Sequence, residues 1–240
     1  MATNIFGHGL ARREHGLGFG YTSIGVHAHF IRRTFFHSRQ DHACGAVPFA
    51  ALWRNSRGTT VQTLIALFRG INVGGAHSLP MKELAALLEG LGAHCVKTYI
   101  QSGNAVFQHK EKNCAQLRSK ISAAVKKQRG FEPVVLVLGV KELERAISGN
   151  PFPEGELEPA TLHVGFLASA PKKPDLQALE SLRRESERFL LKGCCFYLHA
   201  PEGVGRSKLA ARAEKLLGVA VTDRNWRTVC KIRELAKGIT

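Results

Sequence analysis

The chain has 240 residues, with apolar side chains at 44% of its positions and a formal net charge of +15 at pH 7. That apolar content is ordinary for a globular protein, and no apolar run reaches the roughly 18 residues that span a membrane. The six cysteines form no C-x-x-C pair, so neither a zinc site nor a disulfide framework is expected. We therefore expect free thiols in a cytoplasmic protein with no metal and no cofactor.

The composition changes near residue 62. Before it, every basic residue is Arg, six of the eleven His occur, and no helical or strand period is sustained. Three explanations fit: an organellar transit peptide, upstream sequence translated from a misplaced start codon, or a basic arm that contacts nucleic acid. We predict that residues 1–62 are a disordered, non-domain N-terminal extension. If they are a transit peptide, the protein is organellar.

From Thr63 onward the apolar runs and turn residues define regular elements. The first series consists of a strand at 64–68, a helix at 81–91, strands at 96–100 and 105–108, a helix ending at Gly130, a strand at 134–138 and a short helix at 141–148. The second consists of a strand at 162–167, a helix at 175–184, a hairpin of 188–191 with 195–199, a helix at 209–217, a short strand at 219–222 and a final helix at 226–237. The order β-α-β-β-α-β therefore occurs twice.

This order predicts an α+β protein with two ferredoxin-like (βαββαβ) halves, each a mostly antiparallel sheet with helices packed on one face. The first half covers residues 63–150. A segment rich in Pro and Glu at 151–160 is the expected linker. The second half, with the C-terminal helix, covers residues 161–240.

In the first half, the loop after the first strand and the turn between the second and third strands share one edge of the predicted sheet. Their side chains and glycine-exposed amides suit a phosphate, a carboxylate or a base edge. These candidate ligand-binding residues are Arg69, Asn72, Gly74, Gly75, Gln101, Ser102 and Asn104. The same residues also suit plain turns, since Gly74-Gly75 lets the chain reverse and Ser102-Gly103 closes a hairpin.

The candidates of the second half lie on the opposite edge of its sheet, in a loop before a helix and at the end of the fourth strand. They are Gly203, Gly205, Arg206, Ser207, Lys208, Arg224, Asn225 and Trp226. Free N–H groups at the helix N-terminus attract anions, although the loop lacks the Walker A pattern. Alternatively Ser207 and Asn225 cap helices, which is the favoured role for Asn225. Trp226 either stacks on a base or, as is commoner at a first helical turn, packs.

Catalytic residues are not assigned from the sequence. Only Glu202 and Asp223 supply carboxylates near these loops, and no Cys–His or Ser–His–Asp arrangement is visible. His163 and His199 lie inside predicted strands, where a structural histidine is the more common finding. The thiols beside apolar runs are expected to be buried and inert; these are Cys95, one of Cys194 and Cys195, and Cys230.

Several of these segments together resemble a known family. The matching motifs are Arg69–Gly75, Tyr99–Asn104, Asn150-Pro151-Phe152, Leu162-His163-Val164, Gly203–Leu209 and Arg224–Val229. They look like the bacterial family of domain of unknown function 1697, over about Leu64–Lys237. The resemblance implies an α+β fold with ferredoxin-like subdomains and carries no established activity.

The chain departs from the family's pattern in two places. After Gly74-Gly75 it has Ala76-His77-Ser78 where the family usually has basic residues, so any anion contact there is weakened or lost. Residues 1–62 have no counterpart in the resemblance, which favours a transit segment or a wrong start over a functional arm.

The positive charge and the polar glycine-rich loops favour a protein that binds an anion, whether a nucleotide, a phosphorylated ligand or nucleic acid. Two alternatives stay open: an enzyme acting on a phosphorylated small molecule, and a scaffold or interaction protein with no ligand. No membrane partner is expected, and the sequence leaves the oligomeric state open. Arg69 and Arg206 in one pocket would favour a small ligand, whereas engagement of both by the fold would favour a scaffold.

Overall fold

The computed structural model describes residues 60–75 and 77–239, which belong to one compact unit of the chain. Residues 1–59 of the expected N-terminal extension, including Cys44, lie outside the described residues. No helix in the described part of the chain is long and apolar enough to cross a membrane.

The first half is a four-stranded antiparallel sheet with the strand order β2-β3-β1-β4. Its elements are β1 (Gln62–Arg69), α1 (Met81–Gly90), β2 (His94–Tyr99), β3 (Asn104–His109), α2 (Cys114–Arg129) and β4 (Val134–Gly139), followed by α3 (Val140–Ser148). The two central strands are β3 and β1, and the edges are β2 and β4. This is the strand order of a ferredoxin-like sheet.

The second half repeats the same architecture, with the strand order β6-β7-β5-β8. Its elements are β5 (Leu162–Leu167), α4 (Leu176–Leu182), β6 (Arg188–Lys192), β7 (Cys195–His199), α5 (Lys208–Leu217), β8 (Val221–Asn225) and α6 (Trp226–Lys237). Short 3-10 helices lie at Pro153–Glu156 and Val204–Arg206. The predicted α+β class with two ferredoxin-like halves is therefore confirmed.

The apolar run of β1 is buried on both faces of its sheet. Leu64, Ala66 and Phe68 pack in the core that α1 and α2 cover. The alternate residues, Ile65 and Leu67, pack in a second core with α3 and α6. A strand covered on both faces is apolar without alternation, which explains its sequence.

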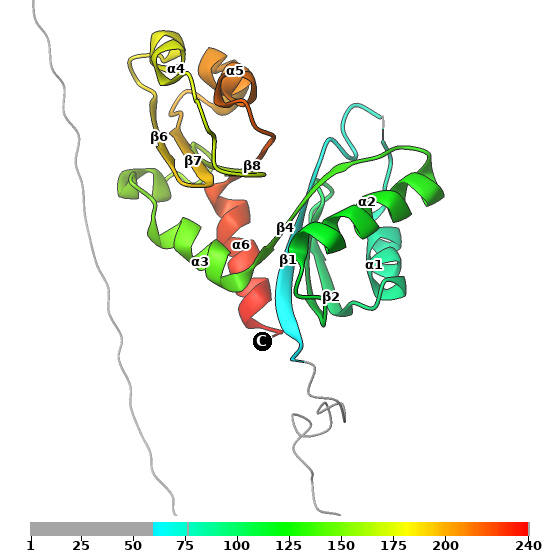
Figure 1. The fold of residues 1–240 in the computed structure, drawn as a ribbon. Coiled ribbons are helices and arrows are strands. Elements are labelled where there is room, and N and C mark those ends of the chain that lie inside the picture. Colours follow the sequence, from blue (N-terminus) through cyan, green and yellow to red (C-terminus); the bar gives the residue numbers. More distant parts are fainter. Residues whose placement is uncertain (1–59, 76, 240) are drawn as a thin grey trace, which may run out of the picture. The chain divides into compact units, whose positions relative to one another are not determined.

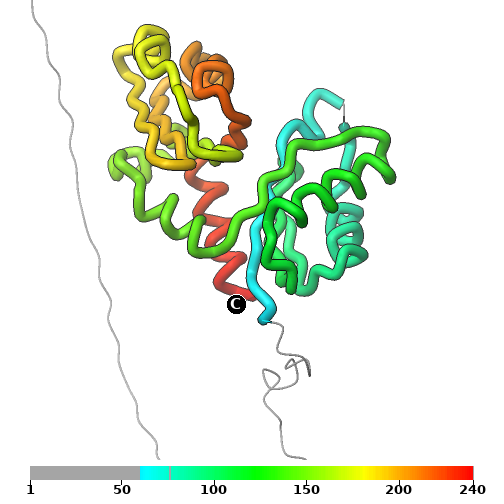
Figure 2. The backbone as a smooth tube through the Cα atoms, viewed as in Figure 1, coloured from blue at the N-terminus to red at the C-terminus, as the bar shows by residue number. Residues whose placement is uncertain are grey.

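Helix α6 is shared by the two halves, as Figures 1 and 2 show for the red C-terminal helix. It contacts β1 and β3 of the first sheet as well as β5 and β8 of the second. Its buried side chains Trp226, Val229 and Ile232 join residues of both sheets in one core cluster. The expectation of helices on one face of each sheet was thus incomplete, since α6 covers the opposite face of both.

The last strand differs from the sequence prediction. A strand was expected at 219–222, whereas β8 covers Val221–Asn225. Its residues are largely polar, and Thr222 and Arg224 are nevertheless buried. An apolar pattern cannot detect such a strand, because a buried residue such as Arg224 is held by hydrogen bonds rather than by hydrophobic contacts.

Candidate anion-binding site

The two loops of the first half meet, as the strand directions predict. The Asn72 side chain donates to the carbonyl of Gln101 at 2.8 Å and to that of Leu79 at 2.9 Å, and its oxygen accepts the Leu79 N–H at 2.7 Å. Asn72 has φ 55°, a conformation in which asparagine is among the most tolerant side chains. Its amide therefore holds the loop closed within the fold, while Gln101 and Ser102 are exposed.

Gly74 and Gly75 lie at the exposed tip of the same loop, with φ of 59° and 77°. Nothing lies within 4 Å of a Cβ added at either position. Both glycines are required by their left-handed backbone rather than by close packing.

Arg69, at the end of β1, forms an ion pair with Glu214 of α5 and donates to the carbonyl of Val221 at 3.4 Å. The same Glu214 carboxylate accepts the N–H of Val221 at 3.1 Å. Arg69 therefore links the first half to the second, and its positive charge already has a carboxylate partner.

Arg224 connects the halves through several hydrogen bonds. Its side chain projects from β8 and donates to Asn104 Oδ1 at 2.5 Å and to the carbonyl of Phe68 at 2.5 Å. The carbonyls of Ser102 and Gly103 lie at 3.2 Å from the same guanidinium. Only 9% of Arg224 is exposed, so these oxygens replace water around a buried charge.

Burial lowers the pKa of Arg224 to about 10, against the opposing effect of the Asp223 charge, so the guanidinium stays charged at neutral pH. Asn104 in turn donates to the Tyr99 carbonyl at 3.0 Å and to Ser102 Oγ at 3.1 Å. Asn104 and Arg224 thus form one network that closes the β2–β3 turn.

The second-half loop, Gly203–Lys208, lies at the N-terminus of α5. The Ser207 hydroxyl accepts the N–H of Ala210 at 3.0 Å and caps this helix. The exposed side chains of Arg206 and Lys208 make no hydrogen bond or ion pair to any described residue. The backbone of the loop is held by a side chain from another segment, because Arg184 donates a hydrogen bond to the Arg206 carbonyl at 2.7 Å.

Asn225 and Trp226 have local structural contacts. The Asn225 side chain accepts the N–H of Thr228 at 3.0 Å and caps α6, and Trp226 is 4% exposed. The structure therefore brings Arg224 to the first-half loops, and it gives Arg69, Asn72, Asn104, Ser207 and Asn225 partners inside the fold. Whether any of these residues also contacts a ligand stays a prediction.

His163 is buried and bonded on both ring nitrogens. Nδ1 lies 2.7 Å from Asp223 Oδ2, and Nε2 lies 3.1 Å from the Ala160 carbonyl. Burial lowers the pKa of His163, but the hydrogen bond and charge of Asp223 and the Ala160 carbonyl outweigh it, so the pKa is raised overall. Both nitrogens are thus occupied within the fold.

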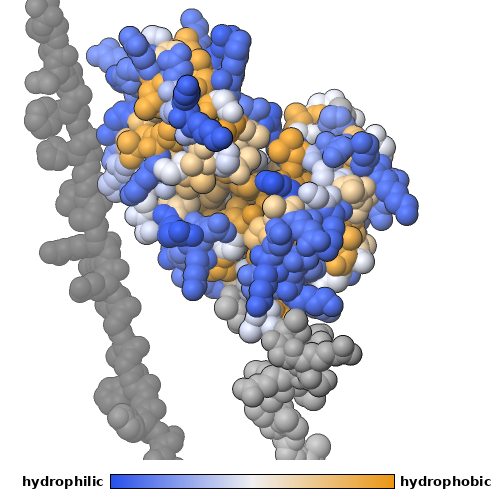
Figure 3. Space-filling model, in the orientation of Figure 1, coloured by the Kyte–Doolittle hydropathy of each residue, from blue (hydrophilic) through white to orange (hydrophobic). Residues whose placement is uncertain are grey.

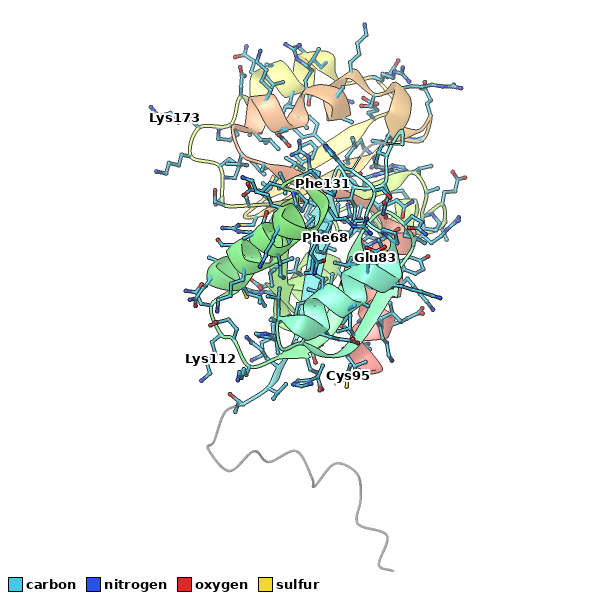
Figure 4. The ribbon with its side chains drawn as sticks, turned by 90° about the vertical axis from the view of Figure 1, so that its right-hand side faces the viewer. Phe68, Glu83, Cys95, Lys112, Phe131 and Lys173 are labelled. Atoms are coloured by element: carbon cyan, nitrogen blue, oxygen red, sulfur yellow. The ribbon has the colours of Figure 1, made fainter. Side chains whose placement is uncertain are left out.

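The prediction of buried thiols is wrong for Cys95 and holds only in part for the others. Cys95 is exposed at a register break in edge strand β2, and Figure 4 shows it at the end of the first half opposite Phe131. A bulge turns side chains out of the regular alternation, so the neighbouring apolar run did not predict its position. Cys194 is also exposed, whereas Cys195 and Cys230 are half-buried.

The sequence reasoning missed a cavity of about 530 Å³ between the two halves. A second cavity of about 430 Å³ shares Arg118, Leu136 and Ala168 with it, and we call the two together the inter-half groove. Figure 3 shows hydrophobic surface gathered in the middle of this face, bordered by hydrophilic side chains. The larger cavity is lined by Cys114, Ala115 and Arg118 of α2, Leu136–Leu138 of β4, Glu142, Arg145 and Ala146 of α3, Phe166–Ala168, Lys192–Cys195 and Tyr197.

The carboxylates that line the groove have hydrogen-bond or ion-pair partners, whereas two of its basic side chains have none among the described residues. The Glu142 carboxylate accepts the N–H of Gly139 at 2.7 Å, at the start of α3. Glu132 pairs with Lys126 at 2.9 Å. By contrast, the side chains of Arg118 and Lys192 make no hydrogen bond or ion pair within the described residues.

Arg145 adds a third cation, and within residues 60–75 and 77–239 its side chain donates only to the Lys141 carbonyl, from Nε at 3.3 Å. The half-buried thiol of Cys195 lies close enough that the Arg145 charge opposes, without overcoming, the rise in its pKa caused by burial. The groove therefore combines apolar walls with an excess of positive charge.

The fold and these contacts define an α+β protein of two ferredoxin-like halves joined through a shared helix and a buried arginine. Residues 61–197, more than half of the chain, match the family described as protein of unknown function (DUF1697), and the chain belongs to that family. The sequence resemblance is thereby confirmed, and β8 and α6 lie beyond the matched range.

The chain is also similar to a solved structure, that of the conserved bacterial protein SP0830 from Streptococcus pneumoniae. The two are 26% identical with a TM-score of 0.56, and the match covers 74% of this chain and 99% of that one. A comparison with curated proteins found no match.

Proposed function

We propose that the protein binds an anionic ligand in the inter-half groove. The observation that supports this is that Arg118 and Lys192 have no ion-pair partner among residues 60–75 and 77–239, in a groove whose carboxylates Glu132 and Glu142 already have partners. A phosphate or carboxylate group would supply the missing partner through charge-assisted hydrogen bonds. The net charge of +15 adds a long-range attraction for the same class of ligand.

The size and lining of the groove also fit a ligand site. Its larger cavity, about 530 Å³, falls within the roughly 300–1,000 Å³ typical of such sites, which are often found between domains. Leu136, Leu138 and Phe166 give it apolar walls. The ligand therefore carries an anionic group at the Arg118 and Lys192 positions and an apolar or extended remainder along the walls.

Calorimetric titration at low salt with citrate and with inorganic pyrophosphate tests the proposal, together with native mass spectrometry for a carried-over ligand. Arg118→Ala and Lys192→Ala should each weaken binding by about tenfold or more. Arg212→Ala is the matched control, since it removes one exposed charge from α5 outside the groove. Binding that all three variants reduce equally would reflect net charge alone and would refute the site.

The second-half loop is a second candidate for the same class of ligand. Arg206 and Lys208 are exposed beside the first turn of α5, and among the described residues their side chains make no hydrogen bond or ion pair, although the charge of Arg206 helps to lower the pKa of Glu202. Arg206→Ala should weaken anion binding by about tenfold or more if this loop is the site, and leave it unchanged if the groove is. A nucleic acid that contacted both regions would show a steep dependence of affinity on salt.

A further inference from the structure

The edge strand β4 differs from the other edge strands in having no protection along its outer side. Both sheets leave two strands with one neighbour each: β2 and β4 in the first half, β6 and β8 in the second. An unpaired strand edge is a template for another strand, and proteins usually protect it with charges, bulges or short length. The register of β2 breaks between His94 and Lys97, β6 carries Arg188 and Lys192, and β8 carries Asp223 and Arg224.

β4 has none of these features. Residues Val134–Leu138 read VVLVL, without charge or proline, and they pair with β1 in an unbroken register. Within the described residues, the backbone of this segment makes hydrogen bonds to β1 alone. Alternate N–H and C=O groups of an antiparallel strand point to each side, so those on the outer side have no partner in the part of the chain that the structure describes.

The inter-half groove runs along this outer edge. Its two cavities are lined by consecutive residues of β4, Leu136–Leu138 in one and Val134–Leu136 in the other. Consecutive residues line a cavity where the edge of a strand, rather than one of its faces, borders the space. Val134 is 44% exposed, so the strand is open to the surface where it begins.

The positive charge around this edge favours an incoming strand with acidic side chains. Arg118 lines both cavities, and Arg145 and Lys192 border the larger one. Another strand of net positive charge, including one from a second copy of this chain at +15, would meet repulsion here. Acidic side chains on the incoming strand would pair with these cations.

We propose that the groove takes an extended segment of an acidic peptide, which adds to the first sheet as a fifth strand beside β4. Main-chain hydrogen bonds to Val134–Leu138 supply the affinity, and Arg118, Arg145 and Lys192 select acidic side chains. This inference rests on the proposed function, because it names the ligand class of the same groove.

The probe is an acetylated nonapeptide of alternating glutamate and valine, titrated at low salt and followed by hydrogen exchange. Binding should slow exchange at amides within residues 134–138, and Arg118→Ala should weaken it by about tenfold or more. The matched control peptide has two adjacent central amides N-methylated, which removes one donor on each edge at unchanged charge. It should bind at least about tenfold more weakly.

The proposed strand addition is wrong if the methylated peptide binds as tightly as the unmethylated one. It is also wrong if the peptide leaves hydrogen exchange at the amides of β4 unchanged. If citrate or pyrophosphate binds through Arg118 while the peptide does not, the proposed function stands and this inference fails. If neither the peptide nor the small anions bind, both fail. If a single-stranded oligonucleotide slows hydrogen exchange in β4 and the peptide does not, the assignment of an acidic peptide as the ligand is also wrong.

Discussion

Arg224 Nε donates a hydrogen bond to Asn104 Oδ1 at 2.5 Å, although 120 residues separate the two along the chain. The bond crosses from the last strand of the second half to the β2–β3 turn of the first. Around it, the guanidinium also donates to the carbonyl of Phe68. The hydrogen bonds of the buried Arg224 guanidinium therefore connect the second half to the first.

Replacing Arg224 should destabilise the whole fold. Arg224→Ala leaves the buried Asn104 and Phe68 oxygens without a donor, and we expect it to lower the free energy of unfolding by about 1.5–3 kcal/mol. Urea denaturation measures the loss. Arg206→Ala is the matched control, because its side chain is exposed and should change stability by less than about 0.5 kcal/mol. Equal effects of the two substitutions would contradict the role assigned to Arg224.

The cap of α6 gives a separate test. Asn225→Ala removes the oxygen that accepts the Thr228 N–H, so the free energy of unfolding should fall by about 1 kcal/mol. Asn225→Ser restores a capping oxygen and should recover most of the loss. Citrate affinity should be unchanged in both variants, and a clear drop in affinity with normal stability would instead make Asn225 a ligand contact.

The His163–Asp223 pair predicts a pH-dependent contribution to stability. Because the folded-state pKa of His163 is raised above its ordinary 6.5, the protonated form is stabilised by folding. The contribution is fully present below about pH 6.5 and is lost as the pH rises through the folded-state pKa. The stability difference between the natural chain and Asp223→Asn should therefore be largest near pH 6 and shrink towards pH 9. A difference that grows with pH would contradict this assignment.

The thiols should react at two rates. Cys95 and Cys194 are exposed and should be alkylated quickly by iodoacetamide at pH 7.5. Cys114, Cys195 and Cys230 are half-buried, and burial raises the pKa of each thiol, so they should react slowly. Peptide mapping by mass spectrometry measures each rate. Rapid labelling of Cys195 in the folded protein would show that the groove opens further than the structure indicates.

The extension can be tested by deletion. The first described strand begins at Gln62, whose side chain donates to the Glu111 carbonyl at 2.6 Å. A chain that starts at Thr60 should therefore keep the melting temperature of the full chain, as measured by circular dichroism. A marked fall in melting temperature would mean that residues 1–59 contribute to folding.

Much of the fold could be predicted from the sequence, because most strands are apolar runs separated by clear turns. The order of elements, and from it both ferredoxin-like sheets, follows from such runs as Leu64–Phe68 and Leu162–Leu167. β8 was partly missed, since polar strand residues such as Arg224 give no apolar signal. The position of α6 between the halves depends on long-range packing that no local pattern encodes.

The strand directions correctly predicted that the two first-half loops meet, whereas the contact of Arg224 with them and the groove were not foreseen. Arg118, Arg145 and Lys192 lie on three separate elements, and each alone reads as an ordinary exposed basic residue. One cue was present in the sequence: the ferredoxin-like order puts the fourth strand at an edge, and Val134–Leu138 carries no charge there. A search for uncharged edge strands would have directed attention to the groove.

The shared helix has a consequence for how the protein matures in the cell. α6 is synthesised after all the strands of both sheets, yet it packs against Ile65 and Leu67 of β1. Until α6 has been made, the part of the first sheet that it covers stays exposed, and such transient apolar surface favours misassociation or the engagement of chaperones. The first half can thus reach its native packing only once α6 is in place, and a premature stop before Trp226 would leave one face of both sheets without this helix.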